Sequence, residues 1–279
     1  MTTAISRRRF LKMTGPLGAI GLVSSYPFFI ERYLVATNTY RIPVPRLPPA
    51  FAGLRVVHLS DLHFGALMPM RVIADVIRRA NELGGDLIVC TGDYVHERNA
   101  ARQIDAVWPE LARLSAPLGV HSVLGNHDHW ADTARSEHWL EQTGQGLRHR
   151  VAALEKDGQQ LWLAGAGDLW EDHRRLDDLL ARIPDAGCRI VLAHNPDTAD
   201  TPFAGRADLM ISGHTHGGQV RLPFLGAPIL PVRNKRYSSG LCRSPRGLGV
   251  FISRGIGWAY LPVRFNCLPE IAVLELRPA

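Results

Sequence analysis

Five short clusters of acidic, imidazole and amide side chains are spaced along the sequence, and each directly follows an apolar run. The clusters are Ser60-Asp61-Leu62-His63, Gly92-Asp93, Gly125-Asn126-His127-Asp128, Ala193-His194-Asn195 and Gly213-His214-Thr215-His216. Any one of them is weak evidence, because Gly-Asp and Gly-Asn are common turn dipeptides. Together they supply the carboxylate, imidazole and amide ligands that Mn²⁺, Fe²⁺ or Zn²⁺ bind, and no cysteine lies among them. The clusters therefore predict a divalent-metal site and disfavour a thiolate-bound structural zinc.

The elements that must position these clusters follow an alternation of short apolar runs and amphipathic helical patterns. Strands that end at a cluster are expected over 54–59, 87–90, 119–124, 189–193 and 209–212. Further strands are expected near 151 and 161 and over 219–222, 250–253 and 271–276, with helices over 72–83, 104–114, from about 132 and over 172–183. A rigid sheet aims the loops at its strand ends toward one point, so the clusters should converge. The pattern predicts one α/β domain built on two packed sheets.

The order of the clusters resembles the motif order of the calcineurin-like metallophosphoesterases, which is Asp-x-His, Gly-Asp, Gly-Asn-His-Asp/Glu, His and Gly-His-x-His. The resemblance covers the chain from about residue 54 to its end. It implies an α/β fold that is a four-layer αββα sandwich, two mixed β-sheets flanked by helices. It also implies two divalent metal ions (Mn, Zn or Fe), with Asp61, His63 and His216 at one ion, Asn126, His194 and His214 at the other, and Asp93 bridging both.

The C-terminal third narrows the branch of this family. The run 213–223, together with Tyr237, the turn 253–255 and the strand entry 269–271, resembles the exported YkuE-like bacterial phosphodiesterases. One departure is informative. The protein Ser/Thr phosphatases extend the second motif to Gly-Asp-x-x-Asp-Arg-Gly, whereas residues 92–98 here read Gly-Asp-Tyr-Val-His-Glu-Arg. A phosphoprotein substrate is therefore disfavoured.

The resemblance implies hydrolysis of a phosphoester, in the first place a phosphodiester, by attack of a metal-bound hydroxide, since two ions that share a water lower its pKa. His127 stands beside a candidate ligand without being one in the family, so it is the candidate catalytic residue that protonates the leaving oxygen. Asp128 either orients His127 and its loop or caps a helix, and a cap is the simpler role for Asp168. His96 has no motif to support it and is expected on the surface or in a loop. The candidate substrate contacts are Asp128, Asp168, Tyr237 and Arg254.

The net charge of the chain is concentrated at its beginning. The 279 residues carry 32 basic and 26 acidic side chains, for a formal net charge of +6. Residues 1–30 hold four of the basic side chains and no acidic one, so the remainder carries 28 basic and 26 acidic side chains. A nearly neutral body disfavours a nucleic-acid partner held by a basic surface, and with it a nuclease. The expected substrate is a small-molecule or lipid-linked phosphoester.

Two alternatives to the phosphodiesterase remain open at this point. The first is a pyrophosphate hydrolase that uses the same metals on a lipid-linked nucleotide sugar at the membrane, which an N-terminal anchor would favour. The second is a non-catalytic scaffold with the same fold. Degenerate relatives of that kind lose metal ligands, and here none of the seven is missing, so the scaffold is disfavoured.

The first 30 residues have the form of an export signal. Ser6-Arg7-Arg8-Arg9-Phe10-Leu11-Lys12 precedes an uncharged run over 13–30, and this resembles a twin-arginine signal. The expected partner is the twin-arginine translocase, and the expected location is the periplasm or the outer face of the cytoplasmic membrane. No small-residue cleavage site follows, so the segment is either removed or kept as an N-terminal membrane anchor. Residues 31–53 are expected to form an extended Pro-rich linker and 54–279 the metallophosphoesterase domain.

The four cysteines are too scattered for a disulfide framework. In an exported protein, Cys242 and Cys267 would either pair or remain two separate thiols.

Overall fold

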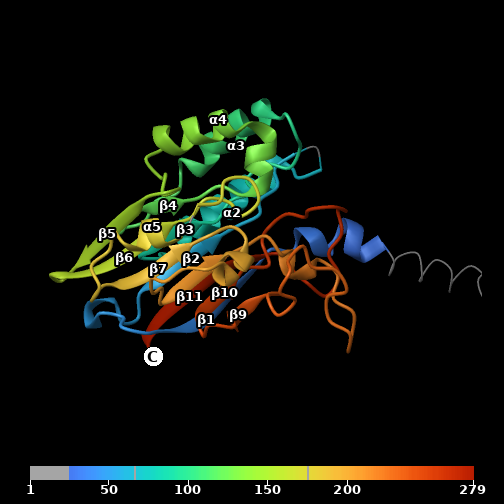
Figure 1. Cartoon of the computed structure of the whole chain (residues 1–279). Coiled ribbons are helices and arrows are strands. Elements are labelled where there is room, and N and C mark those ends of the chain that lie inside the picture. Colours follow the sequence, from blue (N-terminus) through green and yellow to red (C-terminus); the bar gives the residue numbers. More distant parts are fainter. Residues whose placement is uncertain (1–24, 66, 175) are drawn as a thin grey trace, which may run out of the picture.

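Two β-sheets pack face to face, and helices cover their outer sides (Figure 1). The computed structural model describes residues 25–65, 67–174 and 176–279. The arginine-containing signal and most of the uncharged run behind it, over residues 6–24, lie outside the described residues. The first sheet contains the strands that precede the first three polar clusters. The second sheet contains the strands that precede the last two.

The first sheet has five strands in the order β1-β11-β2-β3-β4. Their bounds are β1 (Ala36–Val44), β11 (Glu270–Pro278), β2 (Arg55–Leu59), β3 (Leu87–Cys90) and β4 (Val120–Ser122). Strands β2, β3 and β4 run parallel, and β11 is antiparallel to β2. All four residues of β3 are buried, as expected for a parallel strand covered on both faces.

The second sheet has six strands in the order β5-β6-β7-β8-β10-β9. Their bounds are β5 (Val151–Lys156), β6 (Gln159–Gly165), β7 (Cys188–Leu192), β8 (Leu209–Ser212), β10 (Gly249–Ile252) and β9 (Gly240–Arg243). The four central strands are parallel, and the two edge strands β5 and β9 are antiparallel to their neighbours. Both sheets are therefore mixed, as the family resemblance implied.

Three hydrophobic clusters separate the four layers. Helices α2 (Met70–Glu82), α3 (Ala101–Leu111) and α4 (Asn126–Gln142) pack on the outer face of the first sheet, and α5 (Leu176–Leu180) packs on the outer face of the second. The middle cluster joins the two sheets, with Val56 and Leu274 on one side and Ile190 and Phe251 on the other. Short 3₁₀ turns occur at Glu31–Tyr33, Pro49–Phe51, Pro196–Asp200 and His216–Gly218. The four-layer αββα prediction is confirmed.

Helices α4 and α5 differ from the predicted helices. Helix α4 begins six residues before the expected start and is kinked at Asp132, whose φ of −177° is not helical. The expected helix over 172–183 is reduced to the five residues of α5. Residues 172–174 are not helical, and the carboxylate of Asp172 accepts hydrogen bonds from the side chains of Arg148 and His149.

Residues 31–53 differ from the expected linker. Strand β1 pairs in parallel with β11 along its whole length, and Ile42, Val44 and Phe51 are buried in the core between the sheets. The segment is extended, but it belongs to the domain. The prolines suggested a linker, yet an edge strand tolerates proline because one side of its backbone has no ladder partner, and β1 is an edge strand that contains Pro43.

All four cysteines are free thiols, so Cys242 and Cys267 do not pair in this structure. Within the described ranges, no helix is both long enough and apolar enough to cross a membrane.

Candidate metal centre

The loops that leave β2, β3, β7 and β8 meet at one edge of the sandwich and are tied together by backbone hydrogen bonds. The amide of Asp61 donates to the carbonyl of Gly92 at 2.9 Å, and the amide of His63 donates to the carbonyl of Asp93 at 3.0 Å. The amide of His214 donates to both carboxylate oxygens of Asp61 at 3.0 Å, which joins the loops of the two sheets. The convergence predicted from the strand ends is therefore present.

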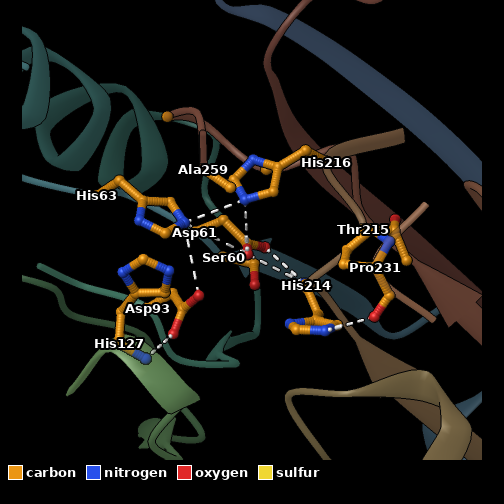
Figure 2. A network of polar contacts seen from close by, with 12 residues as sticks. Ser60, Asp61, His63, Asp93, His127, His214, Thr215, His216, Pro231 and Ala259 are labelled. Carbon is orange, nitrogen blue, oxygen red and sulfur yellow. Dashed lines mark hydrogen bonds and ion pairs between the residues drawn. The ribbon is translucent and has the colours of Figure 1, made fainter. Parts of the chain in front are cut away.

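Asp61, His63 and His216 form the first group of candidate ligands, and all three are buried (Figure 2). The Nε2 atoms of His63 and His216 lie 3.0 Å apart. The Oδ1 atom of Asp61 lies 3.3 Å from the Nε2 atom of His216 and 3.9 Å from that of His63. The three side chains thus direct one oxygen and two nitrogen atoms at a common point.

Asp93, His194 and His214 form the second group. The Nε2 atom of His194 lies 3.2 Å from Oδ2 of Asp93 and 3.0 Å from Nδ1 of His214. The remaining ring nitrogen of each histidine faces a backbone carbonyl, that of Thr91 at 2.7 Å for His194 and that of Pro231 at 3.0 Å for His214. A carbonyl only accepts, so these outer nitrogens carry the protons, and neutral rings present lone pairs to the centre.

Asp93 belongs to the second group and also reaches the first. Its Oδ2 atom is 3.2 Å from Nε2 of His194 in one group and 3.5 Å from Nε2 of His63 in the other. Its Oδ1 atom accepts a hydrogen bond of 2.8 Å from the amide of His127. A carboxylate in this position is shared by both groups.

Asn126 is the seventh candidate ligand and is 98 % buried. In the described part of the chain its Oδ1 atom has no hydrogen-bond partner. A buried amide oxygen without a donor is costly and rare, so an unfilled coordination role explains it better than packing does. The residues present therefore fit a site for divalent cations.

Burial of several carboxylates in one small space favours a bound cation. Burial raises the pKa of Asp61 to about 6, and neighbouring Asp93 adds to the increase. Burial and Asp93 likewise raise the pKa of Asp128 to about 7. Burial also disfavours charge on His194, but Asp93 outweighs this effect and raises the pKa of His194 to about 10. A divalent ion would relieve the mutual repulsion of these acids.

Five of the candidate ligands have a left-handed backbone. Asp61, His63, Asp93, His214 and His216 have φ angles between 47° and 70°. This region is unfavourable for residues other than glycine and is concentrated at functional sites, where the surrounding structure enforces it. The backbone therefore turns sharply at the same residues whose side chains must point into the centre.

The glycines of the motifs leave room for these side chains. A Cβ atom on Gly213 would clash with the Ser60 hydroxyl and the Asp61 carboxylate, and one on Gly125 would clash with the Asp93 carboxylate. The close approach of these side chains to the backbone therefore explains why the Gly-His-x-His and Gly-Asn-His motifs contain glycine.

His127 lies at the edge of the centre, on the first turn of α4. Its Nδ1 atom donates a hydrogen bond of 2.7 Å to the carbonyl of His96, and its ring packs on Trp130 with centroids 4.7 Å apart. The bond to a carbonyl fixes the proton on Nδ1 in the neutral ring, so Nε2 is the nitrogen left to exchange a proton with a substrate. A cavity of about 290 Å³ opens here, lined by Asp93, Arg98, Asn126, His127, Trp130, Trp170, His214, His216 and Tyr260 among others.

Asp128 is buried and supports the loops. Its carboxylate accepts hydrogen bonds of 2.8 to 2.9 Å from the amides of Asp93, Tyr94 and Gly125. It therefore orients the two loops that carry Asp93 and Asn126, and it has a cap's bonding pattern at the start of α4.

The other candidate substrate contacts each hold a neighbouring part of the chain, and in the described residues the second oxygen of Asp168 has no hydrogen-bond partner. One carboxylate oxygen of Asp168 accepts from the amides of Trp170 and Glu171, as a turn cap does. Tyr237 is fully buried, and its hydroxyl donates to Asp200 at 2.5 Å. Arg254 pairs with Glu270 at 2.8 Å. These bonds give all three residues structural roles, and their contact with the substrate stays a prediction.

Sequence reasoning missed two residues at the site. His96, which was expected on the surface or in a loop, does lie in a loop, but its Nδ1 atom is 3.3 Å from that of His63, and its carbonyl accepts a hydrogen bond from His127. Its position three residues after Asp93 was the available signal. Arg264 is fully buried and donates to the carbonyls of His216 and Gly257 at 3.1 Å. A single arginine between apolar residues carries no signal of this kind.

Comparison with known proteins agrees with this geometry. A family model for calcineurin-like phosphoesterases matches residues 54–218. The chain is 34% identical to the uncharacterized metallophosphoesterase YkuE of Bacillus subtilis, with 98% of each chain covered. It is 32% identical to the phosphodiesterase YaeI of Escherichia coli, covering 98% of this chain and 99% of the relative. It is 26% identical to the UDP-2,3-diacylglucosamine pyrophosphatase LpxG of Chlamydia muridarum, covering 82% and 86%. On its motifs, its site and these matches, the chain belongs to the calcineurin-like phosphoesterases.

Proposed function

We propose that this hydrolase of phosphoester bonds is a phosphodiesterase that works with two divalent metal ions. The observation that carries the proposal is the position of the Asp93 carboxylate between two separate groups of ligands. In this assignment Asp61, His63 and His216 hold one ion, Asn126, His194 and His214 hold the other, and Asp93 contacts both. Oxygen and imidazole ligands without thiolate suit Mn²⁺, Zn²⁺ or Fe²⁺.

The side chains around the metal centre supply a proton and positive charge for the reaction. When bound, divalent ions would neutralise charge on the phosphoryl oxygens and lower the pKa of a water for attack on phosphorus. In its protonated form His127 carries a proton on each ring nitrogen, so it donates the Nε2 proton to the leaving oxygen while Nδ1 stays bonded to the His96 carbonyl. Arg98 stacks on Trp130 at 4.1 Å and lines the cavity, so it contributes positive charge at the entrance.

A diester is the preferred substrate for two reasons. The relative YaeI, which matches this chain over nearly its full length, is named a phosphodiesterase. The cavity is also lined by Trp130, Trp170 and Tyr260, whose rings can pack on the second ester group that a monoester lacks.

A pyrophosphate hydrolase is the second candidate. The relative LpxG is named a UDP-2,3-diacylglucosamine pyrophosphatase, and the same two groups of ligands suit attack on either kind of phosphorus centre. The apolar groove beside His216, described below, favours a substrate with an acyl chain.

The decisive experiment combines metal analysis with a substrate screen on the full-length protein. After reconstitution with Mn²⁺ or Zn²⁺, we expect close to two ions per chain. We expect turnover of bis(p-nitrophenyl) phosphate to exceed that of p-nitrophenyl phosphate. Faster cleavage of a UDP-linked diacyl sugar than of any diester would replace the proposal with the second candidate. Fewer than one ion per chain, or two ions without turnover of any of these substrates, would contradict both and favour the scaffold.

A further inference from the structure

Large apolar side chains are exposed together on two loops beside the metal centre. Leu225 is 78 % and Tyr260 76 % exposed, and Phe224 is entirely in solvent. We call the set the apolar face, and its members are Leu222, Phe224, Leu225, Ile229, Tyr260, Leu261 and Phe265. Single exposed apolar residues are normal, whereas a group on neighbouring loops marks an interaction surface. The two loops are joined by hydrogen bonds between the backbones of Arg221 and Phe265 and of Phe265 and Gln219, both of 2.9 Å.

The first described residues of the chain lie against the same loops. The amide of Arg264 donates to the carbonyl of Pro27 at 3.1 Å, and the amide of Cys267 donates to the Glu31 carboxylate at 2.9 Å. Phe29 is 71 % exposed on this segment. Figure 1 shows the blue N-terminal segment beside the orange and red loops. The described end of the uncharged run, over 25–30, therefore lies beside the apolar face.

Basic charge is segregated into the part of the chain that forms this face. Residues 209–269 contain eight basic side chains and no acidic one, whereas the rest of the body beyond residue 30 contains 20 basic and 26 acidic side chains. Arg233, Lys235 and Arg236 are exposed on the loop that continues from Ile229. We call these three residues the basic rim, and an apolar surface whose loop continues into exposed basic residues is complementary to anionic lipid headgroups over acyl chains.

The apolar face also reaches the mouth of the metal centre. An apolar groove of about 130 Å³ runs between the loops and is lined by His216, Gln219, Ile229, Tyr260, Leu261 and Val263 among others. Tyr260 and His216 line both this groove and the cavity at the metal centre. Whatever binds to the apolar face would therefore lie next to the site of hydrolysis.

We propose that the apolar face is a membrane-docking surface for a bilayer that contains anionic phospholipid. Phe224, Leu225 and Ile229 enter the boundary between headgroups and acyl chains, and Arg233 and Arg236 contact the phosphates. The metal centre then opens toward the plane of the membrane. The position of the face beside the described end of the uncharged run, over 25–30, favours a bilayer over a protein partner. The proposal goes beyond the hydrolytic function, because docking requires no turnover.

The test must separate docking by the face from binding by the N-terminal segment, so it uses the full chain and a local probe. In a Cys242→Ser background, since the other three cysteines are buried, Phe224→Cys is labelled with an environment-sensitive NBD fluorophore. The control label is Ala153→Cys, at an exposed position of β5. Figure 1 shows β5 at the left of the view, whereas the orange loops lie at the right. With phosphatidylcholine–phosphatidylglycerol vesicles, we expect a blue shift and quenching by nitroxide lipids at 224 and neither at 153. A protein that sediments with vesicles while the label at 224 remains in water would overturn the proposal, and so would a protein that does not sediment.

The basic rim has its own test. Arg233→Gln with Arg236→Gln should weaken partitioning onto the anionic vesicles by about tenfold and reduce its salt dependence. The matched control is Arg102→Gln with Arg113→Gln, which removes the same charge from exposed positions of the α3 region. Equal partitioning of the two double variants, with thermal unfolding showing both folded, would contradict a role for the rim. Hydrolysis of a diester is measured without lipid. Failure of the labelling test or of the charge test would therefore leave the proposed hydrolytic function unaffected.

Discussion

The Nε2 atom of His194 lies 3.0 Å from the Nδ1 atom of His214, while the other nitrogen of each ring faces a backbone carbonyl. Two lone pairs at this distance repel each other unless a cation lies between or beside them. A proton or a metal ion satisfies the pair, and the Asp93 carboxylate at 3.2 Å supplies the opposing charge in either case. The backbone carbonyls thus preset both tautomers for metal binding.

The bridging position should be the least replaceable. Asp93→Asn removes the charge that both groups of ligands share, so we expect metal content to fall from about two ions to below one. Activity should fall by more than the roughly 10–100-fold that the loss of an outer partner costs. Metal analysis and diester turnover measure the two effects. Asp75→Asn, at an exposed position of α2, is the control. Full occupancy in Asp93→Asn would refute the bridging assignment.

His127 should affect chemistry and leave the metals in place. We expect His127→Gln to lower kcat by about 10²–10⁴ for diesters with alkoxide leaving groups, as the loss of a general acid does. The effect should be much smaller for p-nitrophenolate, which leaves without a proton. His138→Gln, exposed on the same helix, serves as control. An equal loss with both leaving groups, or an emptied metal site, would show that His127 has another role.

Replacement of Asp128 should lower both stability and metal affinity, although Asp128 is not a candidate ligand. Asp128→Asn leaves one acceptor oxygen for three buried amides, those of Asp93, Tyr94 and Gly125. We expect the free energy of unfolding to fall by roughly 3 kcal/mol and metal to be lost at low but not at high Mn²⁺. Urea denaturation and metal titration check this, with Asp132→Asn, a replacement of one cap by another, as control. An unchanged unfolding midpoint would contradict the supporting role.

Two packed sheets and the meeting of the polar clusters could be predicted from where apolar runs end, whereas the four-layer order was implied by the family resemblance. The backbone at the centre could not. Asp93 and His216 have positive φ, which their residue types do not favour and only the surrounding loops enforce. The position of His96 depends on that same turn after Asp93.

Two further differences have physical causes of their own. The sequence predicts a linker over 31–53 because Pro43 and the prolines that follow it suit a linker as well as an edge strand, and only the pairing of β1 with β11 distinguishes the two. Arg264 acts through backbone carbonyls, and carbonyls are present at every position of any sequence. Residues that support a site through the backbone are therefore harder to predict than the ligands themselves.

Acid should weaken the fold through Asp172. Burial opposes its ionisation, but hydrogen bonds from His149 and Arg148 outweigh burial and lower the pKa of Asp172 to about 2. Because the folded pKa lies below the unfolded value of about 3.9, this stabilisation is complete above that value and is lost as the pH falls toward 2. Asp172→Asn should cost about 1 kcal/mol at pH 6, after allowance for solvent screening, and progressively less below pH 4. Urea unfolding across pH 6 to 3 measures it, with Asp157→Asn in an exposed turn as control. A cost that does not change with pH would show that the ion pairs are not its source.

The last prediction concerns export and depends on Arg7 and Arg8, which precede Phe10-Leu11-Lys12 and the uncharged run. A twin-arginine translocase recognises the guanidinium pair, so Arg7→Lys with Arg8→Lys should block export while keeping the charge and leaving the distant metal centre intact. The control is Arg9→Lys, which changes a neighbouring arginine of the same stretch. Because no small-residue cleavage site follows, we expect much of the exported wild type to stay membrane-associated and to face the periplasm or outer surface. Cell fractionation with protease accessibility measures both properties. Retention of the wild type in the cytoplasm would show that the N-terminus is not an export signal, and any membrane contact of the apolar face would then be with the inner leaflet.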